Sequence, residues 1–336
     1  MHLPIPAPLA RSLRAVVNPV HRLDGRRFDP ATPFGPPHGR YSTVHYGVMI
    51  PGLPEPHRFL DVIAVIGQPP VALWRNSHLV QTSDRDTVSL LTATGAMTTD
   101  QLQGYSVAED CELSPDGSSL RFGDRLLFEG SYPDYSVRIT HPQVTADLHL
   151  HATGSVTHFA RLPGGLYDHW SLLCQYTGRI GGVAAAGLCT LEYARGVALR
   201  LPLRSFAYSV LNVDDRTQVL MGQVLGPGGL PVQRVVSVRG LDEPSQSYSR
   251  GFRFDIHGFE SEARATPDGR WMLLPREFEW QVDDGAGGRL IRIAGRMCGD
   301  FTYGMAAGFA GSYRYEGEFR GRAVEGTGYL EYIDGR

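Results

Sequence analysis

One stretch of the chain occurs twice: YTGRIGGVAAAGLCTLEYARG at Tyr176–Gly196 and YEGEFRGRAVEGTGYLEYIDG at Tyr315–Gly335. The two copies align without gaps at an offset of 139 residues, and nine aligned residues are identical, including a consecutive Leu-Glu-Tyr. Self-similarity at a fixed offset is the sequence signature of a repeated structural unit. The repeat therefore predicts two related domains that each end in the same hairpin, with a boundary near residue 200.

Turn signals such as the Pro-Asp-Gly sequences at 115–117 and 267–269 divide the rest of the chain into short apolar or alternating runs. Glycine and proline are frequent, with 40 and 23 residues, and long helical periodicities are scarce. Many short strands with few helices between them indicate an antiparallel all-β fold, as a sandwich or a barrel. The runs predicted as strands are Thr43–Ile50, Phe59–Ile66, Thr87–Leu91, Arg125–Phe128, Ser136–Ile139, Val144–His151, Trp170–Tyr176, Val197–Leu203, Ser205–Leu211, Gln218–Leu225, Val232–Val238, Phe252–His257, Trp271–Leu274, Glu277–Val282 and Leu290–Met297.

The predicted domain organisation has three parts. Residues 1–40 form an N-terminal arm, with a short helix over Leu9–Leu23 that Pro19 interrupts and a proline-rich extended segment at Pro30–Pro37. Residues 41–200 form the first β domain and residues 201–336 the second.

Composition excludes several classes of function. The formal charge of -3 gives no basic face for a phosphate backbone, so nucleic acid is not an expected partner. All 32 basic residues are arginine, which excludes Schiff-base lysine chemistry, a P-loop lysine and attachment of pyridoxal phosphate. Glycine-rich dinucleotide fingerprints and a Gly-x-Ser-x-Gly elbow are absent, so we expect no cofactor. What remains is acid–base catalysis by side chains, or plain binding.

The cellular location and the redox state of the cysteines are predicted from motifs that the sequence lacks. No apolar run approaches the length that spans a bilayer, and prolines interrupt the N-terminus where a signal peptide needs an apolar helix. We therefore expect a cytoplasmic protein without an integral membrane segment. The four cysteines are widely spaced and form no Cys-x-x-Cys pair, which predicts reduced thiols and no zinc ribbon. The sequence gives no indication of oligomeric state.

Two segments carry a resemblance to a known family. The sequence GTGYLE at 326–331, preceded by YEG at 315–317, resembles the end of the carotenoid 1,2-hydratase (hydroxyneurosporene synthase) family and related lipocalin-like proteins. GLYDHW at 165–170 resembles that family's Asp-His-x-Trp-Gly signature, although the residue between His169 and Trp170 is missing and Ser171 replaces the glycine. The resemblance implies two tandem lipocalin-like (calycin) antiparallel β-barrel domains, and it implies water addition or removal on an isoprenoid-like substrate.

The densest candidate site is Tyr167-Asp168-His169-Trp170. A hydratase needs an acid, a base and a wall that tolerates developing positive charge. Burial favours the neutral acid form of a carboxyl group, imidazole exchanges protons near neutral pH, and aromatic faces stabilise a cation. We therefore predict Asp168, His169 and Tyr167 as catalytic and Trp170 as substrate-binding. In an extended segment Tyr167 and His169 share one face and Asp168 and Trp170 the other. The structural alternative is that Asp168 caps a turn while Trp170 packs.

Three other groups of residues have both a functional and a structural interpretation. Trp74, Trp271 and Tyr303 are predicted to line a pocket for an apolar ligand, against the alternative that they belong to the core. Asp147, His149 and His151 project from one face of a strand, where His158 could complete a zinc site; a solvated polar face is the favoured reading, and no metal is predicted. Glu192 and Glu331 recur at equivalent positions, which favours a structural contact of the hairpin over catalysis.

Three functions follow from these observations. The first is a cofactor-independent hydratase or dehydratase, a hydro-lyase, acting on a small hydrophobic alcohol or alkene between the β domains. The second is a cyclase, pericyclase or isomerase on the same fold. The third is a non-catalytic lipid- or terpenoid-binding protein. No motif identifies the substrate or the direction of the reaction.

Overall fold

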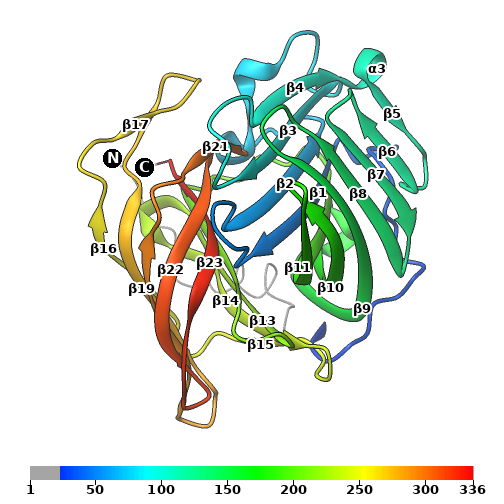
Figure 1. The fold of residues 1–336 in the computed structure, drawn as a ribbon. Helices are drawn as coiled ribbons and strands as arrows, with labels where there is room; N and C mark the ends of the chain where they lie inside the picture. Colours follow the sequence, from blue (N-terminus) through cyan, green and yellow to red (C-terminus); the bar gives the residue numbers. More distant parts are fainter. Residues whose placement is uncertain (1–22, 336) are drawn as a thin grey trace.

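The computed structural model describes residues 23–335 and consists of two large antiparallel sheets (Figure 1). The first sheet has 11 strands, and the second has ten. The first contains β1 Thr43–Pro51, β2 Phe59–Ile66, β3 Thr87–Thr94, β4 Leu102–Ser106, β5 Cys111–Leu113, β6 Ser119–Phe122, β7 Leu126–Ser131, β8 Asp134–Thr140, β9 Thr145–Arg161, β10 Tyr167–Ile180 and β11 Val183–Gly196. The second contains β12 Ser205–Asn212, β13 Thr217–Leu225, β14 Pro231–Gly240, β15 Gln246–Tyr248, β16 Arg253–Phe259, β19 Pro275–Asp283, β20 Arg289–Met297, β21 Thr302–Met305, β22 Gly308–Phe319 and β23 Arg322–Asp334.

Short elements connect these strands. They are the helix α3 Val107–Asp110, the 3₁₀ turns η1 Ala72–Trp74, η2 Ser77–Leu79, η3 Pro163–Gly165 and η4 Pro227–Gly229, and the two-stranded hairpin of β17 Arg264–Ala265 and β18 Trp271–Met272. No helix in residues 23–335 is long and apolar enough to cross a membrane.

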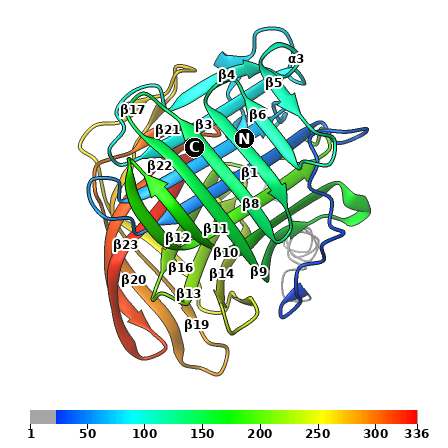
Figure 2. The same cartoon turned by 45° about the vertical axis from the view of Figure 1, so that its right-hand side comes forward.

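Strand order explains the shape of each unit. The first sheet runs β4-β3-β2-β1-β11-β10-β9-β8-β7-β6-β5, and α3 joins its two end strands, so the sheet curls into a nearly closed barrel (Figure 2). The second runs β15-β14-β13-β12-β23-β22-β20-β19-β16 and forms a half-barrel. The predicted all-β fold with two lipocalin-like units is confirmed.

The internal repeat corresponds to equivalent hairpins in the two sheets. Tyr176–Gly196 covers the end of β10 and all of β11, and Tyr315–Gly335 covers the end of β22 and all of β23. β11 pairs with β1, the first strand of its sheet, and β23 pairs with β12, the first strand of the second sheet. Each repeat therefore brings the last strand of its unit against the first. The predicted boundary at residue 200 falls in the link between the sheets and stays a prediction.

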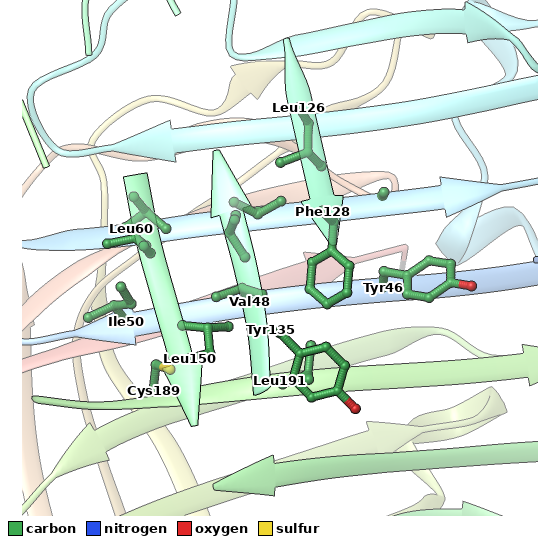
Figure 3. Packing of buried hydrophobic residues seen from close by; sticks show 14 of the residues in the cluster. Tyr46, Val48, Ile50, Leu60, Leu126, Phe128, Tyr135, Leu150, Cys189 and Leu191 are labelled. Carbon is green, nitrogen blue, oxygen red and sulfur yellow. The ribbon is translucent and has the colours of Figure 1, made fainter. Parts of the chain in front are cut away.

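Side chains alternate between the barrel interior and its outer face. On β1, Val44, Tyr46 and Val48 enter the core of the first barrel, which Figure 3 shows from close by, whereas Met49 belongs to a different core between the two sheets. The same alternation on β11 places Leu191 inside the barrel and Glu192 on the outer face. Strands β1, β2 and β11 thus turn one face toward β12 and β23.

The N-terminal arm fills one end of the first barrel. The ring of Phe34 lies within 6 Å of the ring centroids of Trp170 and Tyr193, and Phe28 lies 4.9 Å from Trp170. Tyr46 donates a hydrogen bond to the backbone oxygen of Phe34 (2.6 Å). These contacts complete a packed aromatic core, so the barrel interior is occupied by the protein's own side chains.

One predicted strand is wrong, and one predicted helix lies largely outside the described residues. Val197–Leu203 forms an irregular link between β11 and β12, because Pro202 cannot donate to a ladder and Leu199 donates back to Val197 instead. Leu201 and Leu203 pack against the core between the sheets, which accounts for the apolar pattern that suggested a strand. The helix expected over Leu9–Leu23 falls almost entirely in residues 1–22, which are not described.

Candidate functional site

Three carboxyl groups are buried together between the two sheets. Asp61 on β2 is 0% exposed, Glu192 on β11 is 2% exposed, and Glu331 on β23 is 4% exposed. Carboxyl groups are almost never fully buried unless they are paired or hydrogen-bonded, because burial removes their hydration. The hydrophobic core between the sheets, which includes Met49 and Phe159, lies around them. This cluster is the feature of the interface that packing alone does not explain.

His169 connects the cluster to solvent. Its Nε2 lies 3.6 Å from Oε2 of Glu192, and its Nδ1 lies 3.3 Å from the hydroxyl of Tyr167. The side chain of His169 keeps 19% of its surface exposed, against 2% for Glu192. Tyr208 on β12 donates to Oε1 of Glu192 (2.6 Å). The imidazole therefore stands between a hydroxyl and a carboxylate. Part of the side chain reaches the surface, whereas its Nε2 is buried.

Glu192 is the ionised carboxylate of the site. Burial acts to raise its pKa, but the interactions with His169, Tyr208 and His45 prevail and lower the pKa below its usual value. Arg239 on β14 is fully buried nearby and donates from Nη1 to the backbone oxygen of Ser171 (2.8 Å). Because a guanidinium stays charged in proteins, Arg239 supplies a fixed positive charge close to this carboxylate.

Asp61 and Glu331 form the other half of the cluster around Tyr329. The Tyr329 hydroxyl lies 2.7 Å from Oδ2 of Asp61 and 3.0 Å from Oε1 of Glu331. Burial and the charge of Glu192 raise the pKa of Asp61 to about 8, and burial with the charge of Asp61 raises that of Glu331 well above its usual value. Burial thus favours the protonated form of Asp61 and Glu331, whereas Glu192 stays ionised.

His45 stays neutral beside these groups. Burial, with a smaller contribution from the charge of His169, lowers its pKa to about 4. Its ring lies 5.8 Å from that of His169, centroid to centroid. Gly47 follows on the same face of β1, opposite Glu192 on β11, and a Cβ there would lie 3.0 Å from Nε2 of His45. The absence of a side chain at Gly47 thus leaves room for the imidazole next to Glu192.

Most residues of this cluster were not predicted from the sequence. Asp61, Tyr208, Tyr329, His45 and Arg239 were not among the candidates, and Glu192 and Glu331 were interpreted as structural. One signal was available: Asp61 is the only charged residue in the apolar run FLDVIAVI of β2. The repeated Leu-Glu-Tyr was another, because alternation along a strand places its glutamate on the face opposite to the two apolar residues.

The structure separates the four residues of the predicted Tyr167–Trp170 site onto two faces. Tyr167 and His169 point toward the second sheet, and Trp170 packs inside the first barrel against Phe28. Asp168 is 5% exposed, and its Oδ1 lies 3.7 Å from Nε of Arg161. Asp168 and His169 therefore do not form a pair, and Glu192 occupies the place beside His169.

The other predicted residues are dispersed. Trp74 stacks nearly parallel to Tyr167, with ring centroids 6.5 Å apart, and so adjoins His169. Tyr303 donates to Oδ1 of Asn76 (3.0 Å) beside η2. Trp271 is 71% exposed on the β17–β18 hairpin. Of these three, Trp74 alone lies beside the predicted catalytic residues.

The metal alternative finds little support in the described structure. His149 and His151 lie on the exposed face of β9, where both imidazoles approach Asp134 (3.6 and 2.8 Å). His158, the third ligand required, lies in the environment of Asp168 and Arg161. Within residues 23–335 no group of three His, Cys, Asp or Glu side chains is arranged to hold a metal ion.

A pocket of about 310 Å³ lies in the second sheet, next to the cluster rather than within it. Its lining consists of Ser205, Phe206, Ala207, Gln223, Leu225, Arg234, Phe254, Asp255, Ile256, Phe259 and Tyr332. The ring of Phe206 lies 6.4 Å from that of Tyr208, which is the link between the pocket and the carboxylates.

Comparison with known proteins places the chain in a family. Residues 63–336 match the model of a family of unknown function, DUF6670. The chain belongs to this family. No curated protein matches this DUF6670 protein at a significant level.

Solved structures share its fold. An AttH-like protein from Nitrosomonas europaea matches with a TM-score of 0.61 and 14% identity, over 92% of this chain and 97% of that one. Kievitone hydratase from Nectria haematococca matches with a TM-score of 0.52 and 12% identity, over 93% and 98%. CghA, solved with Sch210972, matches with a TM-score of 0.50 and 9% identity, over 93% and 97%. At these identities the likeness shows the fold alone.

Proposed function

We propose that this DUF6670 protein is a cofactor-independent enzyme that transfers protons on a small hydrophobic molecule, and that its reaction is the addition or loss of water. The observation that carries the proposal is the position of His169, between the Tyr167 hydroxyl and the Glu192 carboxylate at the edge of an apolar interface. The fold shared with an enzyme named kievitone hydratase supports the same class of reaction. The finer assignment to isoprenoid substrates rests on the sequence resemblance.

His169 has the chemistry for both halves of a dehydration. In its protonated form it gives a proton to the leaving hydroxyl group, the C–O bond breaks, and water departs. The neutral imidazole then takes the proton from the neighbouring carbon, whose C–H electron pair forms the double bond, and the imidazolium is restored. Addition of water follows the same steps in reverse.

The residues around His169 support these steps. Glu192 stabilises the imidazolium, and Tyr208 holds Glu192 through a 2.6 Å hydrogen bond. The parallel rings of Trp74 and Tyr167 offer an aromatic wall whose faces stabilise a developing cation. We therefore propose His169 as the catalytic acid and base, Glu192 and Tyr208 as positioning residues, and Trp74 with Tyr167 as the substrate wall.

The aromatic wall also favours a second candidate, an isomerase or cyclase on the same site. Trp74 stacks on Tyr167, and the ring of Phe159 lies 4.8 Å from that of His169, so the imidazole has aromatic neighbours and one hydroxyl beside it. A rearrangement of a hydrophobic substrate needs shape and such isolated donors more than it needs water. The two candidates differ in whether the product has gained or lost a water molecule relative to the substrate.

Turnover in ¹⁸O-labelled water tests the proposal. The wild type, His169→Asn, Glu192→Gln and Asp168→Asn would each be given one panel of hydrophobic alcohols and alkenes, with ligand binding measured in parallel by native mass spectrometry. For the wild type we expect either label in alcohols formed from alkenes or the loss of one water from alcohols. We expect turnover to fall about 10²-fold or more in His169→Asn and to stay near normal in Asp168→Asn, the matched control on the opposite face. Turnover with neither label in the product nor a change in mass by one water identifies the isomerase or cyclase. Loss in Asp168→Asn with retention in His169→Asn overturns the assignment, and binding without turnover identifies a binding protein.

A further inference from the structure

The Tyr329 hydroxyl contacts two carboxyl groups but carries a single hydrogen. Oδ2 of Asp61 approaches it from the facing sheet at 2.7 Å, and Oε1 of Glu331 approaches it from the same strand at 3.0 Å. Both distances are those of hydrogen bonds, and each bond requires its own hydrogen. The Tyr329 O–H supplies one. The other must come from a carboxyl group, because a carboxylate only accepts whereas a carboxylic acid also donates.

The surroundings of this group disfavour two negative charges. Asp61, Tyr329 and Glu331 are each at most 4% exposed, and Oδ1 of Asp61 is buried without a hydrogen-bond partner. The ionised Glu192 already places one negative charge in the cluster, and it acts on both carboxyl groups. Burial, together with the two carboxyl groups, raises the pKa of the Tyr329 phenol well above its usual value, so the phenol keeps its hydrogen.

Several other titratable or charged groups lie near the three residues. Strands β1 and β10 present His45 and His169, β12 presents Tyr208, and β14 presents Arg239. The loop after β20 presents Asp300, which pairs with Arg58 (2.9 Å) and accepts from the backbone of Ser312. The two fixed cations therefore already have acceptors: Arg239 donates to Gln218 and to the backbone oxygen of Ser171, and Arg58 pairs with Asp300.

We propose that Asp61, Tyr329 and Glu331 form a proton-binding site that holds one proton at neutral pH, shared between the two carboxyl groups through the tyrosine, and that this proton joins the two sheets. Asp61 belongs to the first sheet and the other two residues to the second, so the bonded chain exists only while the proton is bound. Loss of the proton turns one short contact into a repulsion between two buried oxygens. The inference does not depend on the chemistry proposed for His169.

The bound proton should make the folded state less stable as the pH rises. A carboxyl group whose pKa is raised by folding binds a proton in the folded state that the unfolded chain has already released. The stability it contributes is complete below its unfolded pKa of about 4 and is lost as the pH rises to its folded pKa, about 8 for Asp61. Between these limits one bound proton changes the unfolding equilibrium constant up to tenfold for each pH unit, toward unfolding at higher pH.

Infrared spectroscopy of the full chain at neutral pH tests the proposal directly, because a protonated carboxyl group has its own C=O stretch above the amide band. We expect this band in the wild type, a downshift in D₂O, and its loss in Asp61→Asn/Glu331→Gln, whose amides replace the acid donor. Asp300→Asn is the matched control, a nearly buried carboxylate already paired with Arg58, and should keep the band.

A second measurement follows the proton through its effect on stability. Denaturation of the wild type at a series of pH values between 5 and 8 reports net proton uptake on folding, and the single variant Asp61→Asn should show a shallower dependence. Absence of the carboxylic-acid band in the wild type at neutral pH overturns the proposal, as does a band unchanged in the double variant or a pH dependence identical in the wild type and Asp61→Asn. All these readouts are separate from turnover, so failure of the proposed enzyme activity would leave them unaffected.

Discussion

Replacement of Tyr208 by phenylalanine isolates one hydrogen bond of the site. The substitution keeps the ring, which packs at 5.4 Å from Phe159, and removes the hydroxyl that donates to Oε1 of Glu192 (2.6 Å). Glu192 is ionised and 2% exposed, so water cannot replace the lost donor. Hydrogen bonds to charged groups contribute about 1.5–3 kcal/mol to stability. We therefore expect Tyr208→Phe to lower the free energy of unfolding by about that amount at neutral pH.

The comparison variant is Tyr315→Phe. Its hydroxyl donates to a neutral acceptor, the backbone oxygen of Asn212 (3.0 Å), and a neutral hydrogen bond contributes about 0.5–1.5 kcal/mol. Both free energies would come from urea denaturation midpoints of the full chain, read by fluorescence and circular dichroism. Since Glu192 has a lowered folded pKa, its stabilisation is present above the unfolded pKa, about 4.3, and is lost as the pH falls through the folded value.

The cost of Tyr208→Phe should therefore shrink in acid, whereas that of Tyr315→Phe should change little. Equal costs for the two variants at neutral pH would refute the ionised state of Glu192. A cost of Tyr208→Phe that stays constant from neutral to acid pH would refute it as well.

Three further predictions concern packing. Gly328→Ala should destabilise the second unit by about 1–3 kcal/mol, because its Cβ would lie 2.4 Å from the buried Cζ of Tyr313; a denaturation midpoint like that of the wild type would contradict this. Gly222→Ala, in the interior of β13 with its nearest neighbour at 3.7 Å, should instead be neutral or stabilise by about 0.5–1 kcal/mol, and a loss of stability would show that the site is tighter than its distances indicate. Phe34→Ala should cost up to about 3–5 kcal/mol and expose the first barrel to an apolar dye, since the ring lies 5.9 Å from that of Trp170 in the aromatic core; unchanged dye binding would show that the arm does not seal the barrel.

Much of the fold can be predicted from local patterns in the sequence. The run FLDVIAVI predicts a strand with the bounds that β2 has, and the repeat predicts the matching hairpins of β10–β11 and β22–β23. These signals are local because alternation and turn chemistry act within a few residues. Val197–Leu203 shows where local patterns fail. Its apolar residues Leu201 and Leu203 pack between the sheets, as the pattern predicts, but the segment does not form a strand.

The site was harder to predict because its residues meet only through packing of the two sheets. Tyr208 and Glu192 are 16 positions apart but lie on different sheets, and Asp61 and Tyr329 are 268 positions apart. No spacing rule connects such residues. The YDHW motif contributed His169 and Tyr167 to the observed group, and alternation along β10 explains why its aspartate points the other way.

The repeat gives the cluster a physical origin. One Leu-Glu-Tyr segment, present in both units, places a glutamate on the outer face of the last strand of each barrel, where a single unit would leave it in water. Packing the two units through these faces buries both glutamates in one place, and two buried carboxylates cannot both stay charged at low cost. The neighbouring groups determine which glutamate is charged. His169 and Arg239 lie near Glu192, which stays ionised. Glu331 contacts Tyr329 together with Asp61, and this group holds the proposed proton. Identical residues at equivalent positions thus take opposite charge states. That difference supplies both the negative charge that positions His169 and the proton that we propose joins the sheets.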